Sequence, residues 1–253
     1  MIDLERQGEI AIATLNRAPV NAIHPEWMAR FHQVLDAIER DPAISVLHIR
    51  SAHKVFCAGY DIAWMRDNLR QRGGPQTQID DTLDLQNLNF RIARLPKVVL
   101  CEIGGAALGG GFELALSGDL RIAADEAMIG LPEANLGQVP GAGGTQRLTR
   151  LCGPGVAARL ILGCESVSGA EARQLGMVQW SVPKADLPAK ARAIAERVAT
   201  FPVNTLAEIK GCIAAQGDHG RNGFDREMMA NHRLLHTPET VALIDAFLDR
   251  RKG

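Results

Sequence analysis

The amino-acid sequence predicts an α/β fold, in which strands and helices alternate over most of the chain and a helical region follows. Short apolar stretches rich in β-branched residues alternate with stretches whose apolar residues recur every three or four positions. From Asp186 onward only the helical period remains. The composition, with 46% hydrophobic and 23% charged residues, is typical of globular domains and excludes collagen-like, coiled-coil and disordered chains.

The first elements follow from local patterns. Residues 9–15 and 44–51 are apolar stretches rich in β-branched residues, and each is predicted to be a strand. A helix is expected between them, because Pro25 suits its first turn and Asp41 with Pro42 ends it. The apolar stripe of this helix consists of Trp27, Phe31, Leu35 and Ile38.

Further strands are predicted at residues 98–103, 119–124 and 177–182. The polar, glycine-containing stretch 70–82 is interpreted as a mobile loop. We expect residues 1–185 to form the core and residues 186–253 to form a helical region. Four helical stretches are expected in that region, at 187–200, 203–216, 226–236 and 238–252. Their apolar faces suit packing on the core or on a neighbouring subunit.

Charge and cysteine content exclude several classes of protein. The 28 basic and 29 acidic side chains give a net charge of −1, which disfavours a nucleic-acid partner. The five cysteines are scattered without a CxxC pair, so neither disulfides nor a zinc site is expected. The N-terminus lacks the order of a signal peptide, and no apolar run is long enough to cross a membrane. These features predict a cytoplasmic protein without a membrane partner.

Common catalytic and nucleotide-binding motifs are absent. The glycines of GGAALGGGFEL do not match GxGxxG, no lysine follows them as in a P-loop, and the sequence has neither GxSxG nor HExxH. His232 and His236 are four residues apart, but no acidic residue completes a ligand set beside them, so no metal site is predicted.

Three segments could carry chemistry. A glycine run between a strand and a helix precedes Glu113. The second segment is predicted to be an apolar strand that ends in Ala58 and Gly59 before a helix expected near Asp61. Amides at a helix start lack internal partners, so either segment could bind a carbonyl oxygen, although close helix packing explains the glycine run equally well. In the third segment, Glu133 lies in a loop that we expect to face a glycine-rich turn. Either glutamate alone would be typical of a solvated surface.

Five ordered motifs resemble the crotonase superfamily of acyl-CoA enzymes, also called the enoyl-CoA hydratase and isomerase family. The motifs are NRAPVNAI (16–23), FCAGYDI (56–62), GGAALGGGFELAL (104–116), the segment 130–153 and AFLDRRK (246–252). The resemblance covers nearly the whole chain. It implies a spiral of repeated ββα units, with C-terminal helices used for trimerisation and a homotrimer or a dimer of trimers as the assembly.

The resemblance also implies roles for individual residues. The backbone amides of Tyr60 and Gly110 match the oxyanion hole, and Glu113 and Glu133 match the catalytic pair. The matching substrate-binding positions are Ala22, Ala58, Asp61, Ile62, Gly109, Pro132 and Gly141. The positions expected to contact coenzyme A are Arg17, Arg250 and Lys252, although basic residues at a helix end also suit the helix dipole. No metal or separate cofactor is implied, since coenzyme A arrives as part of the substrate.

The expected reaction is the reversible hydration of a trans-2-enoyl-CoA. The resemblance assigns water activation to Glu113 and protonation of C2 to Glu133, and two carboxylates with differently tuned pKa values suit these tasks. Isomerisation by one carboxylate, carnitinyl-CoA dehydration, another specialised hydration and non-catalytic binding of RNA or protein remain alternatives. The chain departs from the family at Gly104, where many relatives have asparagine, and at Tyr60, where a small residue is common. The Tyr60 side chain either narrows the acyl pocket or fills space near Trp64.

Overall fold

The computed structural model describes residues 1–71, 73–216, 223–235, 237, 238, 240 and 242. Within them lies a six-stranded sheet with the spatial order β1-β2-β3-β4-β6-β9. Its first two strands are antiparallel, and each later strand runs parallel to its neighbour. The strands are β1 (Ile2–Gln7), β2 (Ile10–Leu15), β3 (Val46–Ser51), β4 (Val98–Ile103), β6 (Leu120–Ala124) and β9 (Trp180–Val182).

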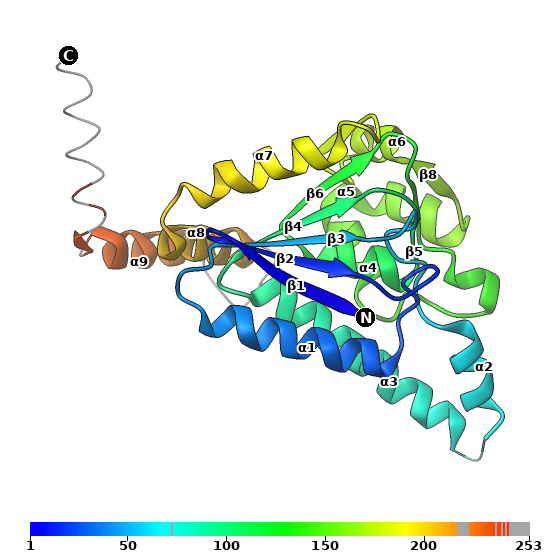
Figure 1. Ribbon diagram of the computed structural model, residues 1–253. Helices are drawn as coiled ribbons and strands as arrows, with labels where there is room; N and C mark the ends of the chain where they lie inside the picture. Colours follow the sequence, from blue (N-terminus) through cyan, green and yellow to red (C-terminus); the bar gives the residue numbers. More distant parts are fainter. Residues whose placement is uncertain (72, 217–222, 236, 239, 241, 243–253) are drawn as a thin grey trace.

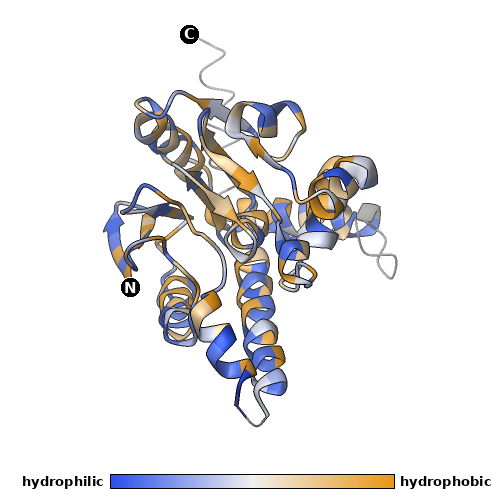
Figure 2. Ribbon diagram, turned by 90° about the vertical axis from the view of Figure 1, so that its right-hand side faces the viewer, coloured by the Kyte–Doolittle hydropathy of each residue, from blue (hydrophilic) through white to orange (hydrophobic). Residues whose placement is uncertain are grey.

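Helices cover both faces of this sheet. Helices α1 (Pro25–Arg40) and α3 (Gly74–Arg94) lie side by side on one side, and α7 (Leu187–Ala199) packs against the strands from the other (Figure 1). Strands β2, β3, β4 and β6 are therefore buried over most of their length, which explains their nearly continuous apolar sequences. Figure 2 shows that the central strands are largely hydrophobic, whereas the helices carry both hydrophilic and hydrophobic residues.

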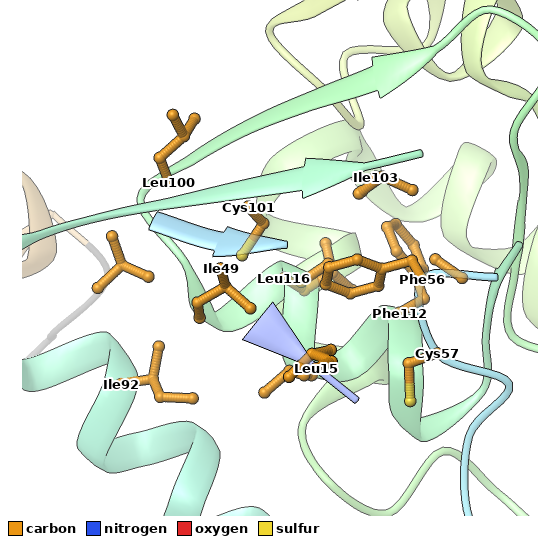
Figure 3. Packing of buried hydrophobic residues seen from close by; sticks show 14 of the residues in the cluster. Leu15, Ile49, Phe56, Cys57, Ile92, Leu100, Cys101, Ile103, Phe112 and Leu116 are labelled. Atoms are coloured by element: carbon orange, nitrogen blue, oxygen red, sulfur yellow. The ribbon is translucent and has the colours of Figure 1, made fainter. Parts of the chain in front are cut away.

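A short helix occupies the centre of the core. Helix α4 (Gly110–Ser117) follows the two-residue strand β5 (Ala107–Leu108), and all of its residues are buried. Phe112 and Leu116 lie among side chains that include Ile49 of β3 and Cys101 of β4 (Figure 3). Strand β5 pairs with β7 (Met128–Gly130), which pairs in turn with β8 (Ser166–Ser168), to form a second sheet. The start of α4 is thus held between two sheets.

The other elements surround this centre. Helix α2 (Ile62–Leu69) precedes α3, and the short 3₁₀ helix η1 (Glu133–Leu136) follows β7. Helix α5 (Gly144–Leu162) breaks at Gly153, where φ is +82°, and α6 (Gly169–Gln174) leads toward β9. The chain then continues through α8 (Val203–Ala215) and α9 (Gly223–Leu235), which pack on each other.

Most predicted elements are present. The strand at 9–15 is β2 and begins one residue later, and the predicted apolar stripe of α1 is fully buried. The strand predicted at 177–182 is shorter, and strand β1, which pairs with β2 beyond the Gly8 turn, was not predicted. The predicted fourth C-terminal helix, at 238–252, lies almost entirely outside the described residues.

Two local predictions are wrong. The stretch 70–82 is mostly helix, since α3 begins at Gly74 with a proline in its first turn and its face carries Leu85, Leu88 and Ile92 further along. Because most residues in the first turns of α3 are polar, the apolar stripe is not evident from the sequence of that part of the helix. The segment leading to Gly59 is not a strand either, because its residues make only isolated bridges, from Cys57 to Ala107 and from Tyr60 to Ile23.

Candidate active site

Glu113 lies in the first turn of α4, and only 3% of it is exposed. One carboxylate oxygen, Oε1, accepts hydrogen bonds from the amides of Ala142 at 2.8 Å and Gly144 at 2.7 Å. Burial raises the pKa of Glu113 above its ordinary value, and these two amides together with the nearby Arg147 guanidinium offset part of that rise. The glycine-rich turn that was expected to face Glu133 therefore binds Glu113 instead.

Glu133 is the first residue of η1 and has a different environment. Both of its carboxyl oxygens are buried, and neither has a hydrogen-bond partner among the described residues. Burial and the neighbouring charge of Glu113 raise the pKa of Glu133 to about 7. The titrations of the two carboxyl groups are therefore coupled. Amide donors stabilise the anion of Glu113, whereas no described donor stabilises that of Glu133. A single proton shared by the pair therefore resides preferentially on Glu133.

Two backbone amides lie close to each other beside this pair. Gly59 has a φ of +94°, and a Cβ built there would lie 3.3 Å from the amide nitrogen of Gly110. A Cβ built on Gly110 would lie 3.7 Å from the amide nitrogen of Tyr60. Glycine at both positions therefore leaves room for the two N–H groups to approach one oxygen atom.

Local structure leaves both amides without partners. Gly110 is the first residue of α4, where an N–H has no intrahelical acceptor. In the bridge to Ile23, the carbonyl of Gly59 accepts from Ile23 and the amide of Asp61 donates to Ile23. Since a trans peptide points its C=O and N–H in opposite directions, the Tyr60 amide points away from Ile23. No backbone hydrogen bond between described residues uses either amide as donor.

A cavity of about 170 Å³ joins the carboxylates to the two amides. Nine predicted site residues line it: Ala58, Tyr60, Ile62, Gly109, Gly110, Glu113, Pro132, Glu133 and Gly141. Gly109 approaches Glu133 so closely that an added Cβ would lie 3.2 Å from Oε1 of that residue. These nine residues come from three separate segments of the sequence, which thus meet at one cavity.

Three of the predicted residues that the structure describes lie outside the cavity lining, namely Arg17, Ala22 and Asp61. The guanidinium of Arg17 donates to the carbonyl of Ala22 at 2.9 Å and pairs with the Asp61 carboxylate at 2.9 Å. Asp61 also caps α2 by accepting from the amide of Trp64. The coenzyme A candidates Arg250 and Lys252 lie outside the described residues.

Several cavity residues were not predicted. They are Gly59, Met65, Gln78, Thr82, Leu85, Leu136, Gln138, Val139 and Ala142. Gln78, Thr82 and Leu85 follow the i, i+4, i+7 spacing of one helix face, and this spacing is the signal in the sequence that indicates them.

The Tyr60 side chain both lines the cavity and lies near Trp64. Its hydroxyl donates to Oδ2 of Asp81 at 2.6 Å, and Nε1 of Trp64 donates to the same oxygen at 3.0 Å. Burial and the Asp81 carboxylate raise the pKa of Tyr60, so the phenol stays protonated at neutral pH. The two alternatives for this side chain, narrowing the pocket and packing near Trp64, are therefore compatible.

Apart from this site, the described residues include a further cavity, but neither a cluster of potential metal ligands nor a helix that could span a membrane. A larger cavity of about 960 Å³ between α3, α5, α8 and α9 contains neither catalytic glutamate candidate. In the part of the chain that the structure describes, no three His, Cys, Asp or Glu side chains are grouped to hold a metal ion. No described helix has the length and apolar character needed to span a bilayer.

Comparison with known proteins gives consistent matches. The sequence model described as enoyl-CoA hydratase/isomerase matches residues 5–253. The crotonyl-CoA hydratase of Syntrophomonas wolfei is 36% identical, and the alignment covers 100% of this chain and 96% of the relative. A probable enoyl-CoA hydratase of Bacillus subtilis is 34% identical over 96% of this chain and 93% of its own length.

The three-dimensional comparison supports the same relationship. The crystal structure of an enoyl-CoA hydratase from Polaromonas sp. JS666 superposes with a TM-score of 0.93 at 30% sequence identity. The match covers 98% of this chain and 97% of that structure. The predicted α/β fold of the crotonase type is thereby confirmed.

Proposed function

The chain belongs to the enoyl-CoA hydratase/isomerase family, and from this premise we propose that it adds water reversibly to a trans-2-enoyl-CoA. The product is a 3-hydroxyacyl-CoA. The observation that carries the proposal is a pair of glutamates with buried carboxyl groups, beside two amides that donate to no described backbone group. Hydration needs a base, an acid and stabilisation of negative charge. The names of the relatives, among them a crotonyl-CoA hydratase, point to the same reaction.

The two amides supply the electrostatic part of the mechanism. The thioester carbonyl oxygen of the substrate binds between the N–H groups of Tyr60 and Gly110. Negative charge develops on this oxygen when C3 is attacked, and preorganised donors in a buried site stabilise that charge strongly. Removal of one such donor typically costs about 10²–10³ in kcat. The amides therefore make C3 electrophilic without a metal or redox cofactor.

The two carboxyl groups supply the proton transfers. Ionised Glu113 accepts a proton from water while the water oxygen forms a bond to C3. The electron pair of the C2=C3 bond moves toward the thioester, and protonated Glu133 donates its proton to C2. The amides that bind Oε1 of Glu113 favour its anionic form, and the absence of partners at Glu133 favours its neutral form. Dehydration reverses each step.

Coenzyme A enters the proposal only as part of the substrate. We propose contacts from Arg17, Arg250 and Lys252, in line with the family resemblance. The side chain of Arg17 is 28% exposed in its pair with Asp61, so part of this side chain is available at the surface. The remaining implied acyl-binding residues, Ala22 and Asp61, act in this proposal by holding Arg17 in place.

The test is the loss of the conjugated enoyl-thioester absorbance after mixing the protein with crotonyl-CoA. Wild type should hydrate this substrate, and Glu113→Gln and Glu133→Gln should each reduce kcat by about 10²–10⁴. Glu196→Gln, an exposed change on α7, serves as the matched control and should keep full activity. Full hydration by either active-site variant would overturn the paired-carboxylate mechanism.

The same variants separate hydration from isomerisation. A 3-enoyl-CoA is converted to the conjugated 2-enoyl-CoA by moving one proton, which a single carboxylate can do. Isomerisation that survives in Glu113→Gln, together with no hydration by wild type, would establish the one-carboxylate alternative.

A further inference from the structure

Tyr60 places a large ring at the oxyanion site, where its own amide is one of the proposed donors. Its hydroxyl reaches across to α3, where it donates to Asp81 at 2.6 Å. Trp64 of α2 donates to the same carboxylate oxygen at 3.0 Å. Asp81 therefore connects the Tyr60 ring to α2 and α3, two of the helices that border the cavity.

Asp81 lies on the face of α3 that is turned toward the cavity. Gln78, Thr82 and Leu85 of this helix line the cavity, and position 81 falls within the same stripe at helical spacing. The Tyr60 ring thus extends from the oxyanion amides to the cavity face of α3. It forms a wall of the space next to the thioester, where the acyl group of a substrate has to lie.

The space bounded by this wall is small. The cavity has a volume of about 170 Å³. An apolar cavity of about 150 Å³ is known to hold a benzene molecule. Because the thioester carbonyl and the attacking water also have to fit into this cavity, it suits only a short acyl group. Longer acyl chains require the wall to move, and the hydrogen bond to Asp81 holds it in place.

We propose that the Tyr60 ring, fixed by Asp81, determines acyl-chain specificity and restricts the enzyme to short trans-2-enoyl-CoA substrates. Asp81 is in this proposal a positioning residue, since it contacts the ring and no reacting atom. The inference rests on the proposed hydratase function and adds the substrate class to it. Its physical basis is that a charge-assisted hydrogen bond in a half-buried site keeps the ring in one orientation.

The first experiment compares kcat/KM for trans-2-enoyl-CoA substrates of four, eight and twelve carbons. Wild type should prefer the four-carbon substrate over the eight-carbon one by at least tenfold. Tyr60→Ala retains the backbone amide but removes the wall, and it should raise the eight-carbon to four-carbon ratio at least tenfold. An unchanged ratio in an active Tyr60→Ala variant, or a wild type without chain-length preference, would overturn the proposal.

Variants of Asp81 test the positioning role separately. Asp81→Ala should raise the same ratio, because the ring is no longer held. Asp81→Asn retains an acceptor oxygen and should restore a ratio near that of wild type. Tyr60→Phe keeps the ring without its hydroxyl and should match Asp81→Ala. Equal ratios in wild type and Asp81→Ala would show that Asp81 has no such role, even if Tyr60→Ala does not fold.

A spectroscopic measurement makes the test independent of activity. Tyr60 is the only tyrosine in the sequence, so phenolate absorbance or a ¹³Cζ-tyrosine NMR signal reports on this residue alone. Loss of the Asp81 carboxylate in Asp81→Ala should shift the phenol titration to lower pH. An unshifted titration would show that the contact is absent in solution and would overturn the proposal. Absence of hydration by wild type with every chain length, combined with a shifted titration, would instead count against the proposed function alone.

Discussion

Two residues of the same chemical type have different surroundings in this site. Glu113 and Glu133 line the same cavity, yet two amides donate to Glu113 and none of the described groups donates to Glu133. The negative charge of Glu113 also raises the pKa of Glu133. This difference favours Glu113 as the base and Glu133 as the acid, an assignment that residue identity alone leaves open.

The first prediction concerns the pH dependence of hydration. Because Glu133 must be protonated to donate to C2, and its pKa is raised to about 7, kcat/KM should fall as pH rises through that value. The decrease should approach about tenfold per pH unit in the alkaline limb. Initial rates with crotonyl-CoA between pH 6 and 9 measure it. A rate that increases through pH 7 would show that Glu133 acts in its ionised form.

The second prediction concerns stability. The folded-state pKa of Glu133 lies above its value of 4.5 in the unfolded chain, so the stabilising effect of its proton is complete below pH 4.5 and is lost as pH rises through about 7. At pH 8 the native protein therefore contains an unfavourable buried charge, which Glu133→Gln removes. Its Tm should exceed that of wild type by about 2–4 °C at pH 8. The difference should disappear at pH 4.5, and a lower Tm at pH 8 would contradict the argument.

At the scale of elements, the start of α4 determines the geometry of the site. Gly109 precedes the helix with a φ of +53° and a ψ of −130°, and its amide donates to the carbonyl of Gly130 in β7. The same few residues therefore turn the chain, present the amide of Gly110 and leave room for Glu133. Close helix packing, one of the two explanations for the glycine run, is present in the structure, since a Cβ on Gly111 would collide with the carbonyl of Cys57.

Gly109→Ala tests this arrangement. The added methyl group would lie 3.2 Å from Oε1 of Glu133, so the acid has to move and hydration should fall at least tenfold. Gly8→Ala is the matched control, because Gly8 has a φ of +61° but no atom within 4 Å of the added carbon. The control should lose about 1–2 kcal/mol of stability with unchanged kcat. Equal kcat values for both variants, measured with saturating crotonyl-CoA, would contradict the role of Gly109.

At the scale of the whole molecule, the C-terminal helices expose apolar side chains. Ile209 and Ile213 lie four residues apart on α8, and Met228 and Met229 lie on α9, with half or more of each residue exposed. Helices α8 and α9 pack on each other beside the α/β core (Figure 1). Grouped apolar exposure of this kind is typical of a surface that contacts another chain.

We therefore expect the protein to associate through this region. Light scattering should give a mass of three or six times 27.3 kDa, as a homotrimer or a dimer of trimers requires. Ile213→Asp places a charge on the exposed face of α8 and should shift the protein toward the monomer at micromolar concentration. A monomeric wild type would contradict the prediction.

The sequence by itself determined the α/β class, the positions of strands β2, β3, β4, β6 and β9, the apolar face of α1 and the segments that carry chemistry. These features depend on local periodicity, on turn residues and on motifs that are contiguous in the chain. The pairing of β1 with β2 and the helical start of α3 were not evident, because polar residues at both places obscure the pattern.

Only the tertiary structure decided how the site works. The glycine-rich turn contacts Glu113, and Tyr60 contacts Asp81, although the members of each pair are far apart in the sequence. The absence of a described donor at Glu133 likewise depends on how distant segments pack. Burial and charge at these places depend on distances between elements, which no local pattern encodes. The two glutamates are recognisable from motifs in the sequence. The different surroundings of their carboxyl groups follow from the tertiary structure, which brings the amides of Ala142 and Gly144 to Glu113 and no described donor to Glu133.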